Sequence, residues 1–171
     1  MRFFYQHIGA DLFARDAPVS LGSPGAERRF SLQEAQTTGR FMEDDKGIQI
    51  WGLPSGAASV CKSMDAGDYL LLLESDDFRY VGKIVYRWPD FREDLSSSMW
   101  GEGKFSIIVA LEGSFVRFPW AQFKSRFGFH DAYHMRGNTM SLSADRIRSA
   151  GFEDAQSVYS WIVNDYGEML K

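Results

Sequence analysis

The stretch "DYLLLLESDDFRYVGKIVYRW", residues 68–88, limits the folds open to this chain more than any other segment. Its uninterrupted "YLLLL" predicts a strand that is buried on both faces, and the alternating "FRYVGKIVYRW" predicts a second strand. The polar "SDD" between the two segments predicts a hairpin turn. Two further strands are predicted at "KFSIIVALEG" and "FVRFPW", residues 104–113 and 115–120. Because parallel neighbours need long crossover connections, this run without helices predicts antiparallel pairing.

Strands and helices are also predicted on either side of this run. β-forming residues predict strands at residues 1–9, 48–53 and 139–143. Capping residues and apolar spacing predict helices at residues 31–39, 55–64, 143–149 and 153–171. The pattern predicts the α+β class: a curled antiparallel or mixed sheet, forming a partial barrel, with peripheral helices. No linker divides the sequence, so we expect residues 1–171 to form one domain, either a whole protein or the N-terminal part of a longer one.

Size, cysteine content and hydropathy indicate the cellular compartment of the chain and whether it spans a membrane. A chain of 171 residues can bury about two thirds of its unfolded surface and needs no disulfides to be stable. The single cysteine, Cys61, suits a reducing compartment. No apolar run approaches the roughly 20 residues that cross a bilayer, and the first residues lack the layout of a signal peptide. We therefore expect a cytoplasmic protein without a membrane partner.

The charge of the chain is unevenly distributed. The formal net charge is -4, yet residues 114–148 carry six basic residues against two acidic ones. Aromatic residues are interleaved with these charges: Phe115, Phe118, Trp120, Phe123, Phe127, Phe129 and Tyr133. Basic residues among aromatic ones are typical of a nucleic-acid surface, and equally of a core strand and helix with solvated arginines. Both interpretations remain open at this point.

A Trp-Gly pair occurs twice, on either side of the most hydrophobic stretch. The segments are "QIWGLPSG", residues 49–56, and "SSMWGEGK", residues 97–104. Glycine after each tryptophan allows a close backbone approach or a positive φ angle. Two indoles with this spacing are candidates for the walls of a slot that holds a planar ring, whereas Trp88, Trp120 and Trp161 are expected to be packing residues.

The order of these pieces resembles the PUA-like superfamily, and within it the YTH and EVE domains, which recognise modified bases. The pieces are Trp51-Gly52, a helix, Gly67-Asp68 leading into "YLLLLES", then "FRYVGKIV", Trp100-Gly101 and "GKFSIIVALEGSFVRFPW". The strand at "FRYVGKI" is similar to the "F-x-G-x-A" strand of YTH domains. The likeness covers roughly residues 40–125 and is greatest to the sensor domains at the front of methylation-dependent restriction enzymes.

The resemblance implies a non-catalytic domain that binds a flipped-out, modified base in an aromatic cage. By this matching Trp51, Gly52, Trp100 and Gly101 form the base site. The base is 6-methyladenine or a modified cytosine in DNA, with RNA as an alternative. The domain would be the sensor of a modification-dependent restriction system, and a nuclease or motor domain or subunit of that system would be its partner. Neither a cofactor nor a metal is expected.

Phosphate contacts are assigned to basic residues near these motifs, because a strand bound in a groove is held mainly through its backbone. The candidates are Lys83, Arg87, Arg117, Lys124, Arg126 and Arg136.

Two alternatives come from other functional classes. Asp90, Glu102 and Lys104 have the spacing of a PD-(D/E)xK nuclease, whose carboxylates hold Mg²⁺. In that family, however, the second carboxylate and the lysine lie within a buried strand, whereas here the apolar strand starts after them. A protein-interaction domain of a defence system is the other alternative. His130 and His134 are four residues apart but lack a third zinc ligand.

Overall fold

The computed structural model describes residues 1–8, 19–20, 48–54, 58–93, 96–97, 105–135 and 139–168. The strands are β1 (Phe3–His7), β2 (Val19–Ser20), β3 (Ile48–Pro54), β4 (Tyr69–Glu74), β5 (Asp77–Arg87), β6 (Phe105–Pro119) and β7 (Thr139–Leu142). The helices are α3 (Ala58–Ser63), α5 (Trp120–Arg126), α6 (Ala144–Ser149) and α7 (Ala155–Tyr166). These elements confirm the predicted α+β class, while the helix predicted at residues 31–39 lies outside the described residues.

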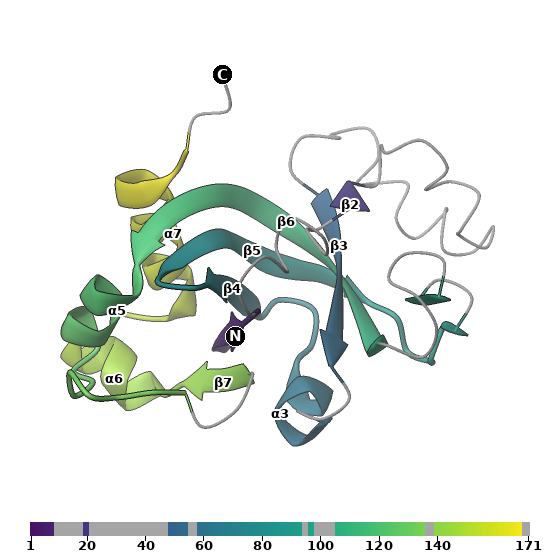
Figure 1. The fold of residues 1–171 in the computed structure, drawn as a ribbon, viewed down its shortest axis with the longest axis horizontal. Coiled ribbons are helices and arrows are strands. Elements are labelled where there is room, and N and C mark those ends of the chain that lie inside the picture. Colours follow the sequence, from purple (N-terminus) through teal and green to yellow (C-terminus); the bar gives the residue numbers. More distant parts are fainter. Residues whose placement is uncertain are drawn as a thin grey trace.

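The described strands form one sheet in the order β2-β3-β6-β5-β4-β1-β7. The predicted antiparallel run is confirmed, because β5 pairs antiparallel with both β4 and β6. β1 pairs parallel with β4 and antiparallel with β7, so the sheet is mixed. Figure 1 shows the long β6 arching over β5 and β4, with α5, α6 and α7 on one side of the molecule and β3 and α3 on the other.

The prediction of two strands at residues 104–113 and 115–120 is wrong, because β6 runs unbroken from Phe105 to Pro119. Gly113, which suggests a break, lies opposite Gly82 of β5. A Cβ atom on Gly113 would lie 2.5 Å from the Cα of Gly82 and would overlap the carbonyl oxygen of Val81. The two glycines therefore let the backbones of β5 and β6 approach closely without ending either strand.

The Gly67-Asp68 pair fixes how β1 enters the sheet. Gly67 has a φ angle of 94°, which glycine adopts without strain. The carboxylate of the buried Asp68 accepts hydrogen bonds from the backbone N–H of Arg2 at 2.8 Å and from its guanidinium at 2.7 Å. It also accepts one from the N–H of Asp65 at 3.0 Å. The turn before β4 thus holds the start of β1 beside it, which sets up the parallel pair.

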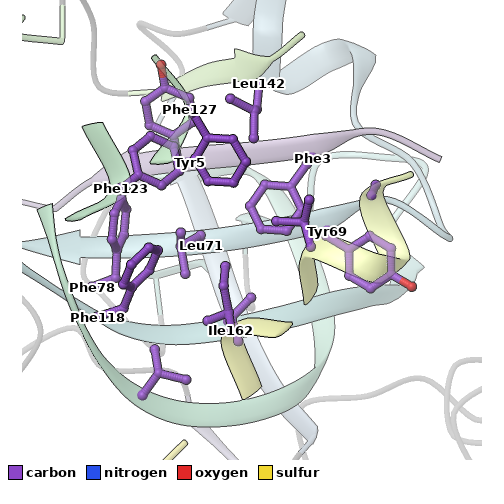
Figure 2. Packing of buried hydrophobic residues seen from close by; sticks show 14 of the residues in the cluster. Phe3, Tyr5, Tyr69, Leu71, Phe78, Phe118, Phe123, Phe127, Leu142 and Ile162 are labelled. Carbon is purple, nitrogen blue, oxygen red and sulfur yellow. The ribbon is translucent and has the colours of Figure 1, made fainter. Parts of the chain in front are cut away.

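Two hydrophobic clusters lie on the two faces of the sheet. The five apolar residues of β4 are buried, with Tyr69, Leu71 and Leu73 on one face and Leu70 and Leu72 on the other. The first face packs against α5, α6 and α7, where Figure 2 shows aromatic rings from several elements in contact. The second cluster includes residues of β3 and α3. Burial on both faces explains why the β4 sequence is continuously apolar.

Capping residues define the starts of the last two helices, and the cap predicted at Ser143 is confirmed. The side chain of Ser143 accepts a hydrogen bond from the N–H of Arg146 at the start of α6. Asp154 and Ser157 form a reciprocal capping box at the start of α7. Gly151, between the two helices, has a φ angle of 84°. None of the helices that the structure describes is long and apolar enough to cross a bilayer.

Candidate functional site

Trp51 lies in the middle of β3, opposite Val109 of β6. Its side chain packs into the cluster that β3 and α3 share, and only 3% of the residue is exposed. The indole N–H donates a hydrogen bond of 3.1 Å to the side-chain oxygen of Gln6, which is also buried. The ring is therefore anchored at its polar atom, and its faces pack against neighbouring side chains.

Gly52 has a structural role that the sequence does not reveal. Its φ angle is not positive, and a Cβ atom at this position would lie 2.7 Å from the ring of Phe105. The glycine therefore makes room for that ring against β3. Trp100 and Gly101 lie outside the described residues, so the cage of two tryptophans stays a prediction.

The described residues that flank the segment carrying Trp100 lie near the first Trp-Gly pair. At its start, the N–H of Trp88 donates a 3.1 Å hydrogen bond to the carbonyl of Ile108, the residue paired with Gly52. At its end, Phe105 pairs with Pro54. Trp88 is thus bonded in the row of Gly52, and Phe105 pairs with a residue two positions along β3 from Gly52.

Arg87 and Lys83, the two predicted phosphate contacts on β5, have different surroundings. The guanidinium of Arg87 donates hydrogen bonds to the carbonyls of Lys62, at 2.8 Å, and Met64. Because these carbonyls lie at the C-terminal end of α3, Arg87 caps that helix. Lys83 lines a cavity of about 350 Å³ together with Glu112, its partner in the β5–β6 register.

Three of the other predicted phosphate contacts have partners within the chain. Arg117 forms an exposed ion pair with Asp77 at 3.5 Å, and the ammonium of Lys124 donates to the carbonyl of Asp131. Arg126 lies over the rings of Phe152 and Trp161, at 4.8 and 5.3 Å from their centres. Arg136 lies outside the described residues. The phosphate contacts stay predictions.

The alternative nuclease site cannot be assembled from the described residues. Asp90 is exposed in the turn after β5, and Glu102 and Lys104 lie outside the described ranges. His130 accepts a hydrogen bond at its Nδ1 atom from the N–H of Ala132, at 3.3 Å. Within the part of the chain that the structure describes, no three His, Cys, Asp or Glu side chains are grouped to hold a metal ion.

Cys61 has the surroundings of a packing residue. It is fully buried on α3, and its thiol donates a hydrogen bond of 3.7 Å to the hydroxyl of Thr139. Burial raises the pKa of this thiol, and the hydrogen bond to Thr139 offsets the effect in part. A thiol held protonated in an apolar site is a poor nucleophile.

A cavity beside Trp120 was not anticipated from the sequence. Trp120 is the first residue of α5 and is half-buried, and it lines a space of about 360 Å³ together with residues of β1, β4 and the segment after α5. The sequence assigns Trp120 to packing, and it does stack on Phe123. Its position at the wall of a cavity depends on contacts between segments that are distant in the sequence. The local sequence around Trp120 does not predict these contacts.

No family model matches this sequence, and no curated protein matches it. Among solved structures, the fold is similar to the N-terminal domain of Thermococcus gammatolerans McrB bound to m5C DNA, with a TM-score of 0.60. The two chains are 15% identical, and the similarity covers 96% of this chain and 98% of that one. The chain therefore has the α+β, PUA-like fold that the sequence motifs predict.

Proposed function

We propose that this chain is a non-catalytic domain that recognises a modified base in DNA. The observation that carries the proposal is the similarity of fold to a domain bound to m5C DNA, which extends over almost the whole length of both chains. The Trp-Gly motifs, found independently in the sequence, support the same function. The domain would act as the sensor of a modification-dependent restriction system, with DNA cleavage supplied by a nuclease or motor subunit.

The base site is proposed to be formed by Trp51 and Trp100. Support comes from the residues on either side of this segment, because Trp88 bonds to the partner of Gly52 and Phe105 pairs with Pro54. Because Trp51 is buried in the described structure, a base can stack on it only if one face of the indole is uncovered when DNA binds. The hydrogen bond to Gln6 would then keep the indole of Trp51 in place while a base stacks on its uncovered face.

Energetics explain why an aromatic cage suits this task. Removing one methyl group from water contributes only about 0.8 kcal/mol. Extruding a base from a duplex costs a few kcal/mol, and stacking on an aromatic side chain contributes about 1–3 kcal/mol per base. Two indoles can therefore offset the extrusion, while selectivity needs polar contacts to the base edge. Several copies acting together would sharpen the discrimination.

A binding experiment with defined duplexes tests this function. Fluorescence anisotropy with EDTA present would compare duplexes that contain one 5-methylcytosine, one 6-methyladenine or no modification. We expect tighter binding of one modified duplex, by about tenfold or more, and no cleavage in a separate reaction in which Mg²⁺ replaces EDTA. Equal binding of all the duplexes would contradict the proposal, and metal-dependent cleavage would favour the nuclease alternative.

A further inference from the structure

A second candidate site lies on the face of the sheet opposite Trp51. Along β1, Phe3 and Tyr5 belong to the cluster under α5, α6 and α7, whereas Gln6 bonds to Trp51 on the other face. His7 follows the alternation of Phe3 and Tyr5 and faces the helices. The cavity of about 360 Å³ at this end of the sheet is lined by His7, Leu73, Ser75, Asp76, Trp120, Lys124, His134 and Met135.

The wall formed by Trp120 is held firmly. The indole stacks on Phe123 with 5.3 Å between ring centres and 16° between ring planes, and it meets the edge of Phe78 at 5.8 Å. Figure 2 shows Phe123 and Phe78 packed together in the cluster beneath. The backbone N–H of Trp120 donates a 2.8 Å hydrogen bond to the carbonyl of Asp76, which joins α5 to the β4–β5 turn. This wall is thus fixed before any ligand arrives.

The lining residues include three kinds of group that a nucleotide needs. Trp120 and Met135 offer apolar surface for a planar ring. Lys124 contributes a cation, and the imidazoles of His7 and His134 contribute N–H donors, which suit a phosphate. Asp76 contributes a carboxylate, which accepts hydrogen bonds from an exocyclic amino group of a base. A carboxylate would repel a phosphate placed beside it, so the phosphate must lie away from Asp76, and an amino group is a ligand group that suits this position.

We infer that this cavity binds one nucleotide whose base carries an exocyclic amino group, with cytosine as the simplest case. The base lies against Trp120 with its amino group directed at Asp76, and the phosphate lies between Lys124 and the two imidazoles. The volume is at the lower end of the range for small-molecule sites, which begins at about 300 Å³ and suits a single nucleotide. The same chemistry is offered by a free mononucleotide and by one nucleotide of a strand.

Titrations with nucleotides test this site on the full chain. Cytidine 5′-monophosphate and uridine 5′-monophosphate would be compared by NMR, with the Trp120 indole N–H as the reporter signal. We expect saturable binding of the cytidine nucleotide at low millimolar concentrations and about tenfold weaker binding of the uridine nucleotide. A short single-stranded deoxycytidine oligonucleotide is the second probe. Tighter binding of the oligonucleotide assigns the site to a strand, and equal binding assigns it to free nucleotides.

Two variants locate the binding in this cavity. Lys124→Met is expected to weaken binding of the cytidine nucleotide about tenfold, whereas Asp76→Ala is expected to remove the preference over the uridine nucleotide. Lys62→Met, on the far face of the sheet, is the matched control and should bind as the unaltered chain does. Absence of saturable binding by both probes, or binding that neither variant changes, would overturn the inference. Because the base site proposed above uses Trp51 and Trp100, methyl-dependent duplex binding would persist if this inference failed.

Discussion

The indole N–H of Trp51 and the side-chain oxygen of Gln6 are 3.1 Å apart, although their strands, β3 and β1, are four places apart in the sheet. In a flat sheet four steps of about 4.8 Å would separate such strands by roughly 19 Å. The hydrogen bond is therefore direct evidence that the sheet curls into a partial barrel. The interior that this curl encloses holds Trp51.

Changes at Trp51 test this packing. Trp51→Ala should lower the free energy of unfolding by about 3–5 kcal/mol, because it removes a large ring from a close-packed cluster. Trp51→Phe should cost less, about 1–3 kcal/mol, mainly because Gln6 loses its buried partner. Urea denaturation measures both effects, with Phe91→Ala as the control because Phe91 is 49% exposed. A Trp51→Ala variant as stable as this control would contradict the packing.

Gly52→Ala tests the contact between β3 and the ring of Phe105. The added methyl group would lie 2.7 Å from that ring, so the ring must move. We expect a loss of about 1–3 kcal/mol in the free energy of unfolding, as for an overpacked core. The double variant Gly52→Ala/Phe105→Gly should recover part of that loss in a double-mutant cycle, because the added methyl group would lie 2.8 Å from the Cβ atom of Phe105 as well as against its ring. Additive effects of the two changes would show that the contact does not constrain Gly52.

Gly113→Ala tests the close approach of β5 and β6. Here the new methyl group would meet the backbone at Val81 and Gly82, which cannot rotate away. We expect a loss of about 3 kcal/mol or more in the free energy of unfolding. Ser114→Ala, one residue further along the same strand, is the control and should change stability little. Equal stability of the two variants would disprove the close approach.

Alkaline pH should destabilise the fold through its tyrosines. Burial raises the pKa of Tyr5 and of Tyr80 well above the ordinary phenol value of 10.0. Above that value the unfolded chain releases protons that the folded chain keeps, so the free energy of unfolding falls as pH rises. Above pH 10 the free energy of unfolding falls by about 1.4 kcal/mol per pH unit for each such tyrosine. Below pH 10 these tyrosines do not change the free energy of unfolding as pH varies. Urea denaturation between pH 8 and 11 measures the slope.

Tyr5→Phe is the matched variant for this pH dependence. The change removes one ionisable phenol and its 3.0 Å hydrogen bond to Tyr133, and it keeps the ring in the cluster. Its free energy of unfolding should fall less steeply above pH 10 than that of the unaltered chain. An identical slope would show that Tyr5 does not contribute.

Much of the fold follows from local sequence patterns. The β4–β5 hairpin is predicted because a run of apolar residues and an alternating run are joined by a polar turn. The helix α6 is predicted from its capping residue, and α7 from apolar residues at four-residue spacing. The continuity of β6 is not predictable in this way. Gly113 is a residue type that is common in turns. Only its pairing with Gly82 shows that it permits a close approach of the β5 and β6 backbones. Local patterns do not contain that non-local contact.

The site is less accessible to prediction than the fold. The sequence marks Trp51 by its glycine neighbour, but the burial of the ring and its bond to Gln6 depend on the curl of the sheet. Arg87 and Arg126 are equally ambiguous, since a basic residue near aromatic ones serves DNA binding and internal packing alike. The structure shows Arg87 capping α3 and Arg126 over aromatic rings. These roles depend on tertiary neighbours.

The most direct test of the proposed function is the ratio of two dissociation constants, for an unmodified duplex and for the same duplex with one 5-methylcytosine. The unaltered chain should give a ratio of about ten or more for this duplex or for the corresponding duplex with one 6-methyladenine. Trp100→Ala should reduce the ratio to about one, while Trp161→Phe, which alters a tryptophan on α7, should leave it unchanged. A ratio of about ten or more in the Trp100→Ala variant would contradict the tryptophan cage. A ratio of about one in the unaltered chain, for every modified base tried, would contradict recognition of a modified base.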